Sequence, residues 1–399
     1  MPFDIASRFR PGLPVAESAW VPTPRFSFVG GHNDEANIPF GGLAEAAVSA
    51  LRREGRSLAN YNLGGSPLGY ERLRAFIASA LRDRTAMACE ADDVLVTSGS
   101  LQALDLVNEL LLEPGDTVIV EKATYGGMLS RLSRRGVRVV GAELDTDGIR
   151  TDRLAETLAE LAAEGVRPKY LYTIPTVQNP TGGVMSLARR HEILSLARQY
   201  ELPVFEDDCY ADLLWEGDRP PSLRALDGEG GQVIYCGSFS KSIAPALRIG
   251  YLVADPLVLA QMLALKTDAG SGALEQLVLA EYAASHFDDH VDRLRSVLRS
   301  KGETMMAAVT ANFGDAVSFD RPKGGIFLWL TFADDRVNTT ALVAPAAAEG
   351  IEFNPGAGWS TDAEWGRKRL RLCFGHPEPE VIDQGVAALA QVFRNESML

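Results

Sequence analysis

The sequence predicts an α/β protein with a large, doubly wound, mostly parallel sheet domain and a smaller α+β domain. Between residues 92 and 255, short apolar runs alternate with stretches of helical periodicity, and repeated strand–helix units of this kind build right-handed parallel sheets. Each run is apolar on consecutive residues, which is typical of strands that helices cover on both faces. After about residue 255 long helices precede strands, which indicates a separate, smaller lobe.

The expected elements follow this pattern in order. Residues 1–40 are rich in Pro and Gly and predict an irregular N-terminal arm, and helical patterns occupy 41–55 and 70–83. Strands of the large sheet are expected within 92–100, 116–125, 137–144, 168–176, 201–208, 231–240 and 248–255, with helices at 101–112 and 189–200. Strands of the small lobe are expected within 316–320, 325–330 and 369–374. The elements predict a large domain over 41–290 and a small domain over 291–399, to which part of the arm belongs.

Composition and charge narrow the functions that fit this chain. Of its 399 residues 46% are hydrophobic and 23% charged, and the net charge of −14 argues against a nucleic-acid partner, because phosphate neutralisation needs clustered Lys and Arg. We find no sequence pattern typical of a membrane span or a signal peptide. The four cysteines have no disulfide or zinc spacing, so a reducing cytoplasm is the expected location.

Lys241 is the central candidate, because it comes directly after an expected buried strand, in GSFSKSIAPALRIGY. A lysine whose pKa is lowered by burial and nearby cations attacks an aldehyde as a neutral amine. Ser238, Ser240 and Arg248 would then bind a phosphate. One alternative is a surface lysine in a loop. Another is the SxxK motif of serine acyl enzymes, but that class also needs SDN-like and KTG-like elements, which we do not find.

The stretch around Lys241 resembles the lysine signature of fold-type I aminotransferases, which use pyridoxal 5′-phosphate (PLP). The resemblance implies the PLP-dependent transferase fold and PLP held as a Schiff base on Lys241. Asp207, at a strand end in VFEDDCY, would keep the pyridine nitrogen protonated so that the ring acts as an electron sink. Tyr210, three residues on, would hydrogen-bond the phenolic oxygen of the ring. The alternative for Asp207 is a helix cap, and Asp208 is expected to be structural.

Two further motifs match the same family. Asn179 begins NPTG, 28 residues before Asp207 and 62 before Lys241, and the resemblance assigns it to the 3′-oxygen of the cofactor and to the substrate site. The alternative is a simple turn. The segment TSGSLQ joins a strand to a helix, whose N-terminus binds phosphate through free N–H groups. The resemblance assigns Ser100 and the amides of Leu101 and Gln102 to the PLP phosphate; the alternative is a serine N-cap.

The remaining site residues come from the resemblance alone. Tyr125 matches the aromatic residue that stacks on the pyridine ring, with core packing as its alternative. Tyr61, in a Gly-rich loop, matches a tyrosine that reaches the phosphate in the neighbouring subunit, which implies a homodimer with shared active sites. Arg371 would bind the substrate α-carboxylate through its planar fork; its alternative is a surface arginine. Gly31 and the adjacent Gly30 are expected beside the substrate.

These motifs span residues 61 to 371, in an order similar to class I/II aminotransferases. The closing stretch resembles the branch of the 2-aminoadipate and kynurenine aminotransferases and the catalytic domains of MocR-type regulators, except that Trp359 and its neighbours depart from it. The resemblance implies amino transfer from an L-amino acid to a 2-oxo acid through pyridoxamine phosphate. The alternative is elimination, replacement, decarboxylation or oxidation on the same fold. A MocR-type regulator would need a basic winged-helix segment.

No metal site is expected from this sequence. His286 and His290 have one-face helical spacing, but a metal needs a third ligand and a buried site, so we expect a solvated helix face. Cys209 and Cys236 lie close to the proposed catalytic strands, and their apolar neighbours predict ordinary core residues.

Overall fold

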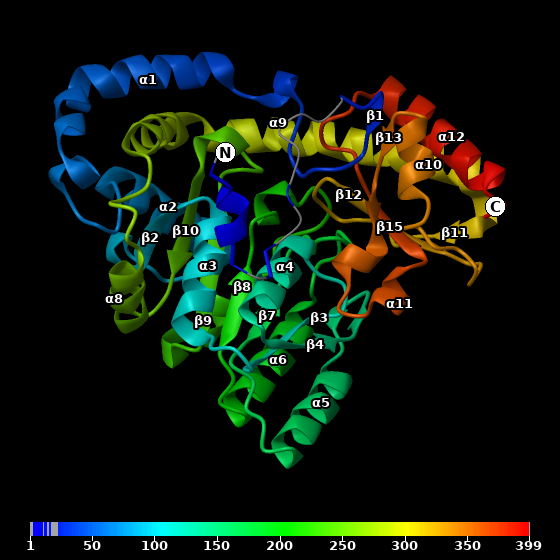
Figure 1. Cartoon of the computed structure of the whole chain (residues 1–399). Helices are drawn as coiled ribbons and strands as arrows, with labels where there is room; N and C mark the ends of the chain where they lie inside the picture. Colours follow the sequence, from blue (N-terminus) through cyan, green and yellow to red (C-terminus); the bar gives the residue numbers. More distant parts are fainter. Residues whose placement is uncertain (1–2, 11, 14–15, 17–22, 399) are drawn as a thin grey trace.

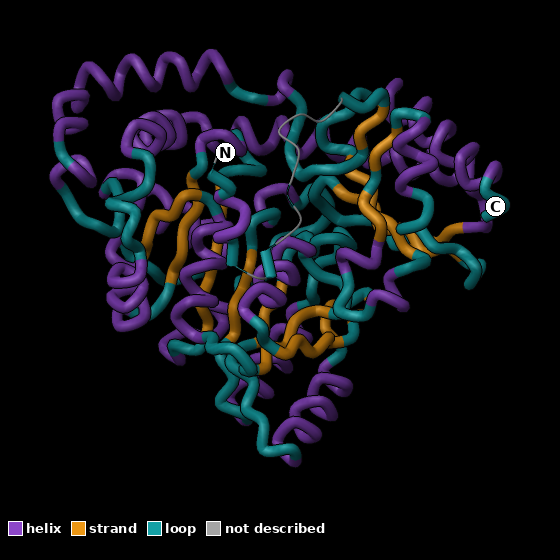
Figure 2. The backbone as a smooth tube through the Cα atoms, in the orientation of Figure 1, coloured by secondary structure: helices purple, strands orange, loops and turns teal. Residues whose placement is uncertain are grey.

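Two groups of strands organise the chain into a large and a small lobe (Figure 2). The structure is a computed structural model and describes residues 3–10, 12–13, 16 and 23–398. In Figure 1 the large lobe holds the strands β2–β4 and β7–β10, and the small lobe holds β11, β12 and β15 near the C-terminus. The predicted α/β fold is therefore confirmed.

The large sheet has seven strands in the order β2-β10-β9-β8-β7-β3-β4. Its strands are β2 (Val94–Ser98), β3 (Thr117–Glu121), β4 (Arg138–Ala142), β7 (Leu171–Thr173), β8 (Val204–Asp207), β9 (Val233–Ser238) and β10 (Ile249–Val253). Every pair that excludes β10 is parallel, as predicted, whereas β10 is antiparallel to both neighbours. Only ten residues, 239–248, join β9 to β10. A parallel crossover needs a dozen or more residues, so this strand turns back.

Helices cover the sheet, and its central strands are buried along their whole length. This explains why their sequences are apolar on consecutive residues. The helices of the large lobe are α1 (Phe40–Glu54), α2 (Glu71–Thr85), α3 (Ser100–Leu111), α4 (Gly126–Arg135), α5 (Thr151–Ala163), α6 (Leu187–Gln199), α7 (Leu223–Asp227) and α8 (Pro256–Leu265). A short hairpin joins β5 (Leu144–Asp145) to β6 (Gly148–Ile149).

One helix of 41 residues, α9 (Ala273–Phe313), runs across both lobes (Figure 1). It packs against α1 and α2 in the large lobe and against α12 and β12 in the small lobe. The domain boundary expected between residues 290 and 291 falls inside this helix, so no break in the backbone marks it. No helix of the described residues is both long and apolar enough to cross a bilayer.

The small lobe is built on an antiparallel sheet in the order β11-β12-β15-β14. A separate parallel pair, in which Phe26 faces Ile351, ties residues of the N-terminal segment to this lobe. The strands are β1 (Phe26–Ser27), β11 (Val317–Ser318), β12 (Phe327–Phe332), β13 (Ile351–Glu352), β14 (Asn354–Pro355) and β15 (Arg369–Cys373). The helices are α10 (Val343–Ala348), α11 (Ala363–Gly366) and α12 (Pro379–Asn395).

The expectation of a solvated histidine face on α9 is wrong for one of its two residues. His286 is exposed, but His290 is buried and its Nε2 lies 2.9 Å from the carbonyl oxygen of Ser242. Burial lowers the pKa of His290. Through this contact with Ser242, His290 on α9 supports the loop that follows Lys241.

Candidate active site

A pocket opens at the carboxyl ends of the parallel strands, which is where ligands bind in open α/β sheets. It encloses about 620 Å³ of space between its atoms, part of it open to solvent. Nine residues predicted from the sequence line it, namely Ser100, Leu101, Tyr125, Asn179, Asp207, Tyr210, Ser240, Lys241 and Arg248. They come from segments far apart in the sequence, which the fold brings to one edge of the sheet.

Lys241 lies in the turn directly after β9, and its Nζ donates a hydrogen bond to the carbonyl oxygen of Gly31. The Nζ atom is also 5.5 Å from the centre of the Tyr210 ring. Burial lowers the pKa of Lys241, and the positive charges of Arg371 and Arg248 act in the same direction. Burial and these positive charges favour the neutral amine that a nucleophilic lysine needs.

Asp207 ends β8 with its carboxylate buried and 6% of the residue exposed. Its Oδ2 accepts a hydrogen bond of 2.7 Å from the Tyr172 hydroxyl, and its Oδ1 one of 3.2 Å from the backbone N–H of Cys209. Within the described part of the chain it forms no salt bridge. Burial raises the pKa of Asp207, which indicates a carboxylate without a cationic partner.

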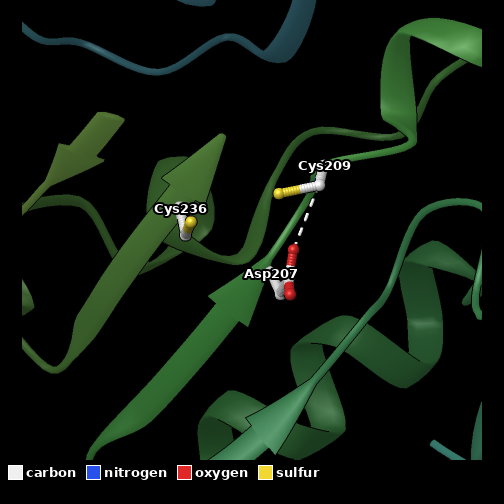
Figure 3. Close-up of side chains that lie close together, drawn as sticks. All are labelled: Asp207, Cys209 and Cys236. Carbon is white, nitrogen blue, oxygen red and sulfur yellow. Dashed lines mark hydrogen bonds between the residues drawn. The ribbon is translucent and has the colours of Figure 1, made fainter. Parts of the chain in front are cut away.

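Figure 3 shows Asp207 at its strand end, with Cys209 beyond it and Cys236 on the neighbouring strand. Both thiols are free and buried, as expected of core residues, and Cys209 also lines the pocket. The carboxylate and the two sulfur atoms lie within 4.8 Å of one another. Donation from the Cys209 thiol toward Cys236, together with burial, raises the pKa of Cys209 well above its usual value, so this thiol remains protonated and uncharged.

One end of the pocket is the N-terminus of α3, which begins at Ser100 after Gly99. Gly99 has a φ of +73°, and a side chain there would collide with the guanidinium of Arg248. Arg248 donates from Nη2 to the carbonyl oxygen of Ser98 at 3.1 Å, so its charge lies beside the free N–H groups of the helix. This arrangement suits a phosphate.

Two residues assigned to the phosphate do not line the pocket. Ser238 accepts a hydrogen bond of 3.1 Å at its Oγ from the backbone N–H of Ser240, which fixes the turn before Lys241. The side chain of Gln102 accepts from the N–H of Ser98 at 2.8 Å and donates to Asp268 at 2.6 Å. The family resemblance assigned the backbone N–H of Gln102 to the phosphate, and this group lies in the first turn of α3.

Arg371 on β15 does not itself line this pocket, but it bonds to the pocket-lining Asn179 from the small lobe, and only 3% of the residue is exposed. Its Nη1 donates to Asn179 Oδ1 at 3.0 Å, and its Nη2 to the Gly30 carbonyl at 2.8 Å and to Asn354 Oδ1 at 2.7 Å. Its Nε is buried and has no hydrogen-bond partner among the described residues. Burial lowers the pKa of Arg371 to about 10, so it stays charged at neutral pH.

Two aromatic rings enclose the Arg371 guanidinium. Its Cζ atom lies 3.8 Å from the ring centre of Phe327 and 3.5 Å from that of Trp359. Trp359 is also 5.9 Å from the ring of Tyr125, between ring centres. The guanidinium is therefore held by hydrogen bonds in its plane and by rings on its faces.

The model for class I and II aminotransferases matches residues 35–389. The chain belongs to this family. It is 31% identical over 394 residues to an aromatic-amino-acid aminotransferase of Thermococcus litoralis, which covers 98% of this chain and 92% of the relative. It is 34% identical over 373 residues to a 2-aminoadipate transaminase of Thermus thermophilus, covering 92% and 90% of the two chains.

A solved aminotransferase structure agrees with this fold. The α-aminoadipate aminotransferase of Thermus thermophilus, complexed with N-(5′-phosphopyridoxyl)-L-leucine, superposes with a TM-score of 0.85 at 33% identity and covers 94% of this chain and 93% of its own. This aminotransferase therefore uses PLP and acts on amino acids and 2-oxo acids, and the predicted family, fold and cofactor are confirmed.

The pocket of this aminotransferase fits PLP on its own chemistry. The buried, unpaired carboxylate of Asp207 matches a protonated ring nitrogen, and the part-buried Lys241 amine matches an aldehyde. The free N–H groups at Ser100 and the charge of Arg248 match a phosphate. The buried Nε of Arg371 leaves a donor for a substrate carboxylate.

Tyr61 is a fifth predicted residue outside the pocket lining, after Ser238, Gln102, Arg371 and Gly31. It is 83% exposed, in a short 3₁₀ turn over Tyr61–Gly64. The sequence interpretation placed Gly30 beside the substrate together with Gly31, but it missed the contacts that Arg371 makes with Asn354 and Phe327. These two residues reach the arginine through the register of β14 and β12 with β15, which no local motif reports.

Proposed function

We propose that this aminotransferase works as a homodimer, with PLP on Lys241 and the substrate carboxylate on Arg371. The observation that carries the proposal is that nine predicted residues from separate motifs of the sequence line one pocket. When bound, PLP supplies an aldehyde for covalent linkage to amines and a ring that accepts an electron pair. The residues of this chain bind it, orient the substrate and move protons.

Lys241 first holds the cofactor and then acts as the base. Once free of the cofactor, the Nζ atom, whose pKa burial lowers, would be the group that takes up the proton from the substrate Cα. The Gly31 carbonyl, which accepts a hydrogen bond from Nζ, keeps the amine near this position. A positioned amine of this kind contributes about 10²–10⁴-fold in rate.

The other residues would hold the cofactor and the substrate in place. Ser100, the amides of Leu101 and Gln102, Ser240 and Arg248 bind the phosphate, with Ser238 supporting the turn. Of the other residues that line the pocket, Asp207 would keep the ring nitrogen protonated, Tyr210 and Asn179 would hydrogen-bond the ring oxygen, and Tyr125 would pack against the ring. Arg371 and Gly31 place the α-carboxylate and the Cα of the substrate beside Lys241.

Lys241→Ala tests the central assignment. The holoenzyme is reduced with borohydride and digested, and the modified peptide is identified by mass spectrometry. We expect the reduced adduct on Lys241 in the native protein, and neither adduct nor turnover in the variant. An adduct on another lysine, or turnover by the variant, would show that the assignment is wrong.

The dimer is supported by the surface around Tyr61. Four other large apolar side chains of the segment 40–61 are also exposed, namely Phe40, Val48, Leu51 and Leu58. Exposed apolar groups clustered in this way are typical of an interface. We propose that a second copy covers this surface and that Tyr61 reaches the phosphate in the partner's pocket. The cytoplasmic location stays a prediction, which rests on the four free cysteines.

Hybrid dimers test shared sites. Tyr61→Ala and Lys241→Ala subunits with different tags are coexpressed, so that each hybrid dimer contains one intact site. Because half the dimers are hybrids with one site each, the mixture should recover about a quarter of native activity although both homodimers have little. No recovery in purified hybrid dimers would exclude the sharing of Tyr61.

A further inference from the structure

A second buried carboxylate, which the proposed mechanism does not use, lies at the end of β3. Glu121 is only 1% exposed and does not line the cofactor pocket. Its Oε1 accepts hydrogen bonds from Thr173 Oγ1 at 2.6 Å and from the N–H of Ile174 at 3.0 Å. Its Oε2 accepts one from Gln178 Nε2 at 2.8 Å. All three donors are neutral, so this carboxylate is held by hydrogen bonds rather than by an ion pair.

Gln178 continues the network with a fully bonded amide. Its Nε2 also donates to the Ala123 carbonyl at 2.7 Å, and its Oε1 accepts from the N–H and Oγ1 of Thr181 at 2.9 and 2.8 Å. A primary amide has two donor hydrogens and two acceptor positions, so all of its hydrogen bonds are made. Such an amide has a single orientation, and it fixes the groups bonded to it.

The network joins two segments that enter the cofactor pocket. The first follows β3 and leads from Glu121 through Ala123 to Tyr125, and the second includes Gln178 and the adjacent Asn179. The Oδ1 atom of Asn179 accepts from Arg371, so its orientation also affects the carboxylate site.

We infer that Glu121 is a positioning residue, which acts through Gln178 to fix the segments carrying Tyr125 and Asn179 around the cofactor. The inference rests on the proposed roles of Tyr125 and Asn179. A carboxylate suits this position because it only accepts, whereas three donors converge on it.

Glu121→Gln is designed to remove the hydrogen bond between residue 121 and Gln178. With its oxygen toward Thr173 and Ile174, the new amide presents N–H groups to the N–H of Gln178, so the bond to Gln178 is lost while the side-chain shape is kept. Reversing the amide would instead lose the bonds to Thr173 and Ile174. Either orientation loosens the link between the two segments.

Glu206→Gln is a matched control. Glu206 lies on β8, is 0% exposed and accepts from the backbone N–H groups of Leu223 and Arg224 at 2.8 and 2.9 Å. Burial raises the pKa of both Glu121 and Glu206 to about 7. Glu206 bonds to the start of α7, pairs with the buried Arg190 at 3.8 Å and does not line the cofactor pocket, so its variant has the cost of a buried amide without a bond to Gln178.

The experiment compares native protein and both variants by thermal stability of the cofactor-free form, by the pH midpoint of the visible band of the bound cofactor, and by KM and kcat. Both variants should lose stability. Only Glu121→Gln should shift the band midpoint and lower kcat/KM, by about 10- to 100-fold as expected for a small misplacement of reacting groups.

A band midpoint and kcat/KM of Glu121→Gln that match those of Glu206→Gln would overturn the inference. If Glu121→Gln does not fold, Thr173→Val replaces it, because it removes one donor to Glu121 and should shift the band in the same direction by less. An unchanged band in Thr173→Val would then overturn it. Failure of the proposed function is distinguishable, because the native protein itself would lack the reducible link at Lys241.

Discussion

Replacing Arg371 by lysine tests how the small lobe recognises the substrate. The arginine makes three hydrogen bonds, to Asn179, Gly30 and Asn354, and lies between two aromatic rings. A lysine keeps the positive charge but has one nitrogen, which cannot satisfy these acceptors and also bind a carboxylate in a bidentate way. The variant therefore removes the planar fork and leaves the rest of the pocket unchanged.

The expected cost follows from these contacts. A hydrogen bond to a charged group contributes about 1.5–3 kcal/mol, and a desolvated cation–π contact about 0.5–2 kcal/mol. Loss of one carboxylate bond together with part of the ring contacts corresponds to about 2–4 kcal/mol, or about 30- to 1000-fold in affinity. Because the carboxylate is bound before and during the reaction, the change should appear mainly in KM.

The assay follows the half-reaction spectrally with an L-amino acid and with the corresponding amine that lacks the carboxylate. Arg371→Lys should weaken the reaction of the amino acid by the amount above and leave that of the amine nearly unchanged. Arg369→Lys is the matched control, since Arg369 lies on the same strand and stacks on Trp365, but donates to the Trp365 carbonyl rather than to Asn179 and Gly30. Equal losses for both substrates would refute a carboxylate-binding role for Arg371.

Three further perturbations test other parts of the site. Asp207→Asn keeps the shape but removes the charge, so kcat should fall about 10²–10³-fold while the cofactor stays attached, and unchanged turnover would contradict its role. Gly31→Ala places a Cβ 3.3 Å from Lys241 Nζ and should slow the half-reaction on the order of 10- to 100-fold, and an unchanged rate would contradict the proposed position of Gly31. Because burial raises the pKa of Glu121 to about 7, its stabilising contribution is complete below the unfolded pKa of 4.5 and lost as pH rises through 7. The melting temperature of cofactor-free Glu121→Gln should therefore fall less than that of the native protein between pH 5 and 8, and parallel curves would contradict this.

Much of the large lobe could be predicted because its strands are buried on both faces and its reactive residues follow strand ends. Consecutive apolar residues mark β3, β8 and β9, and the carboxyl ends of parallel strands meet at one edge. Asp207 and Lys241 were therefore placed near each other before any contact was known. The reversed direction of β10 needed a further step, since it depends on the length of a loop and not on the apolar pattern.

The surroundings of Arg371 could not be predicted, for a physical reason. Asn354 meets it only because β14 pairs with β15 in one register, and Phe327 comes from the strand on its other side. Such pairings depend on the packing of the whole lobe, whereas a motif reports only local sequence. Glu121 was missed for a related reason, because a glutamate in EKATY gives no sign of being buried without a cation. Tyr61 needs a second copy to show its proposed partner.

At this site each lobe contributes one buried charged group that lacks a partner of opposite charge among the described residues. The large lobe supplies Asp207, a buried carboxylate without a cation, and the small lobe supplies Arg371, a buried guanidinium with an unpaired Nε among the described residues. Each such group costs folding free energy, because removing a charge from water is repaid only by a well-placed partner. In the proposed function a cationic ring and a substrate carboxylate would be those partners, so binding should release much of the cost that folding incurs. Because binding offsets part of this folding cost, we expect the cofactor and the substrate each to stabilise the protein against unfolding.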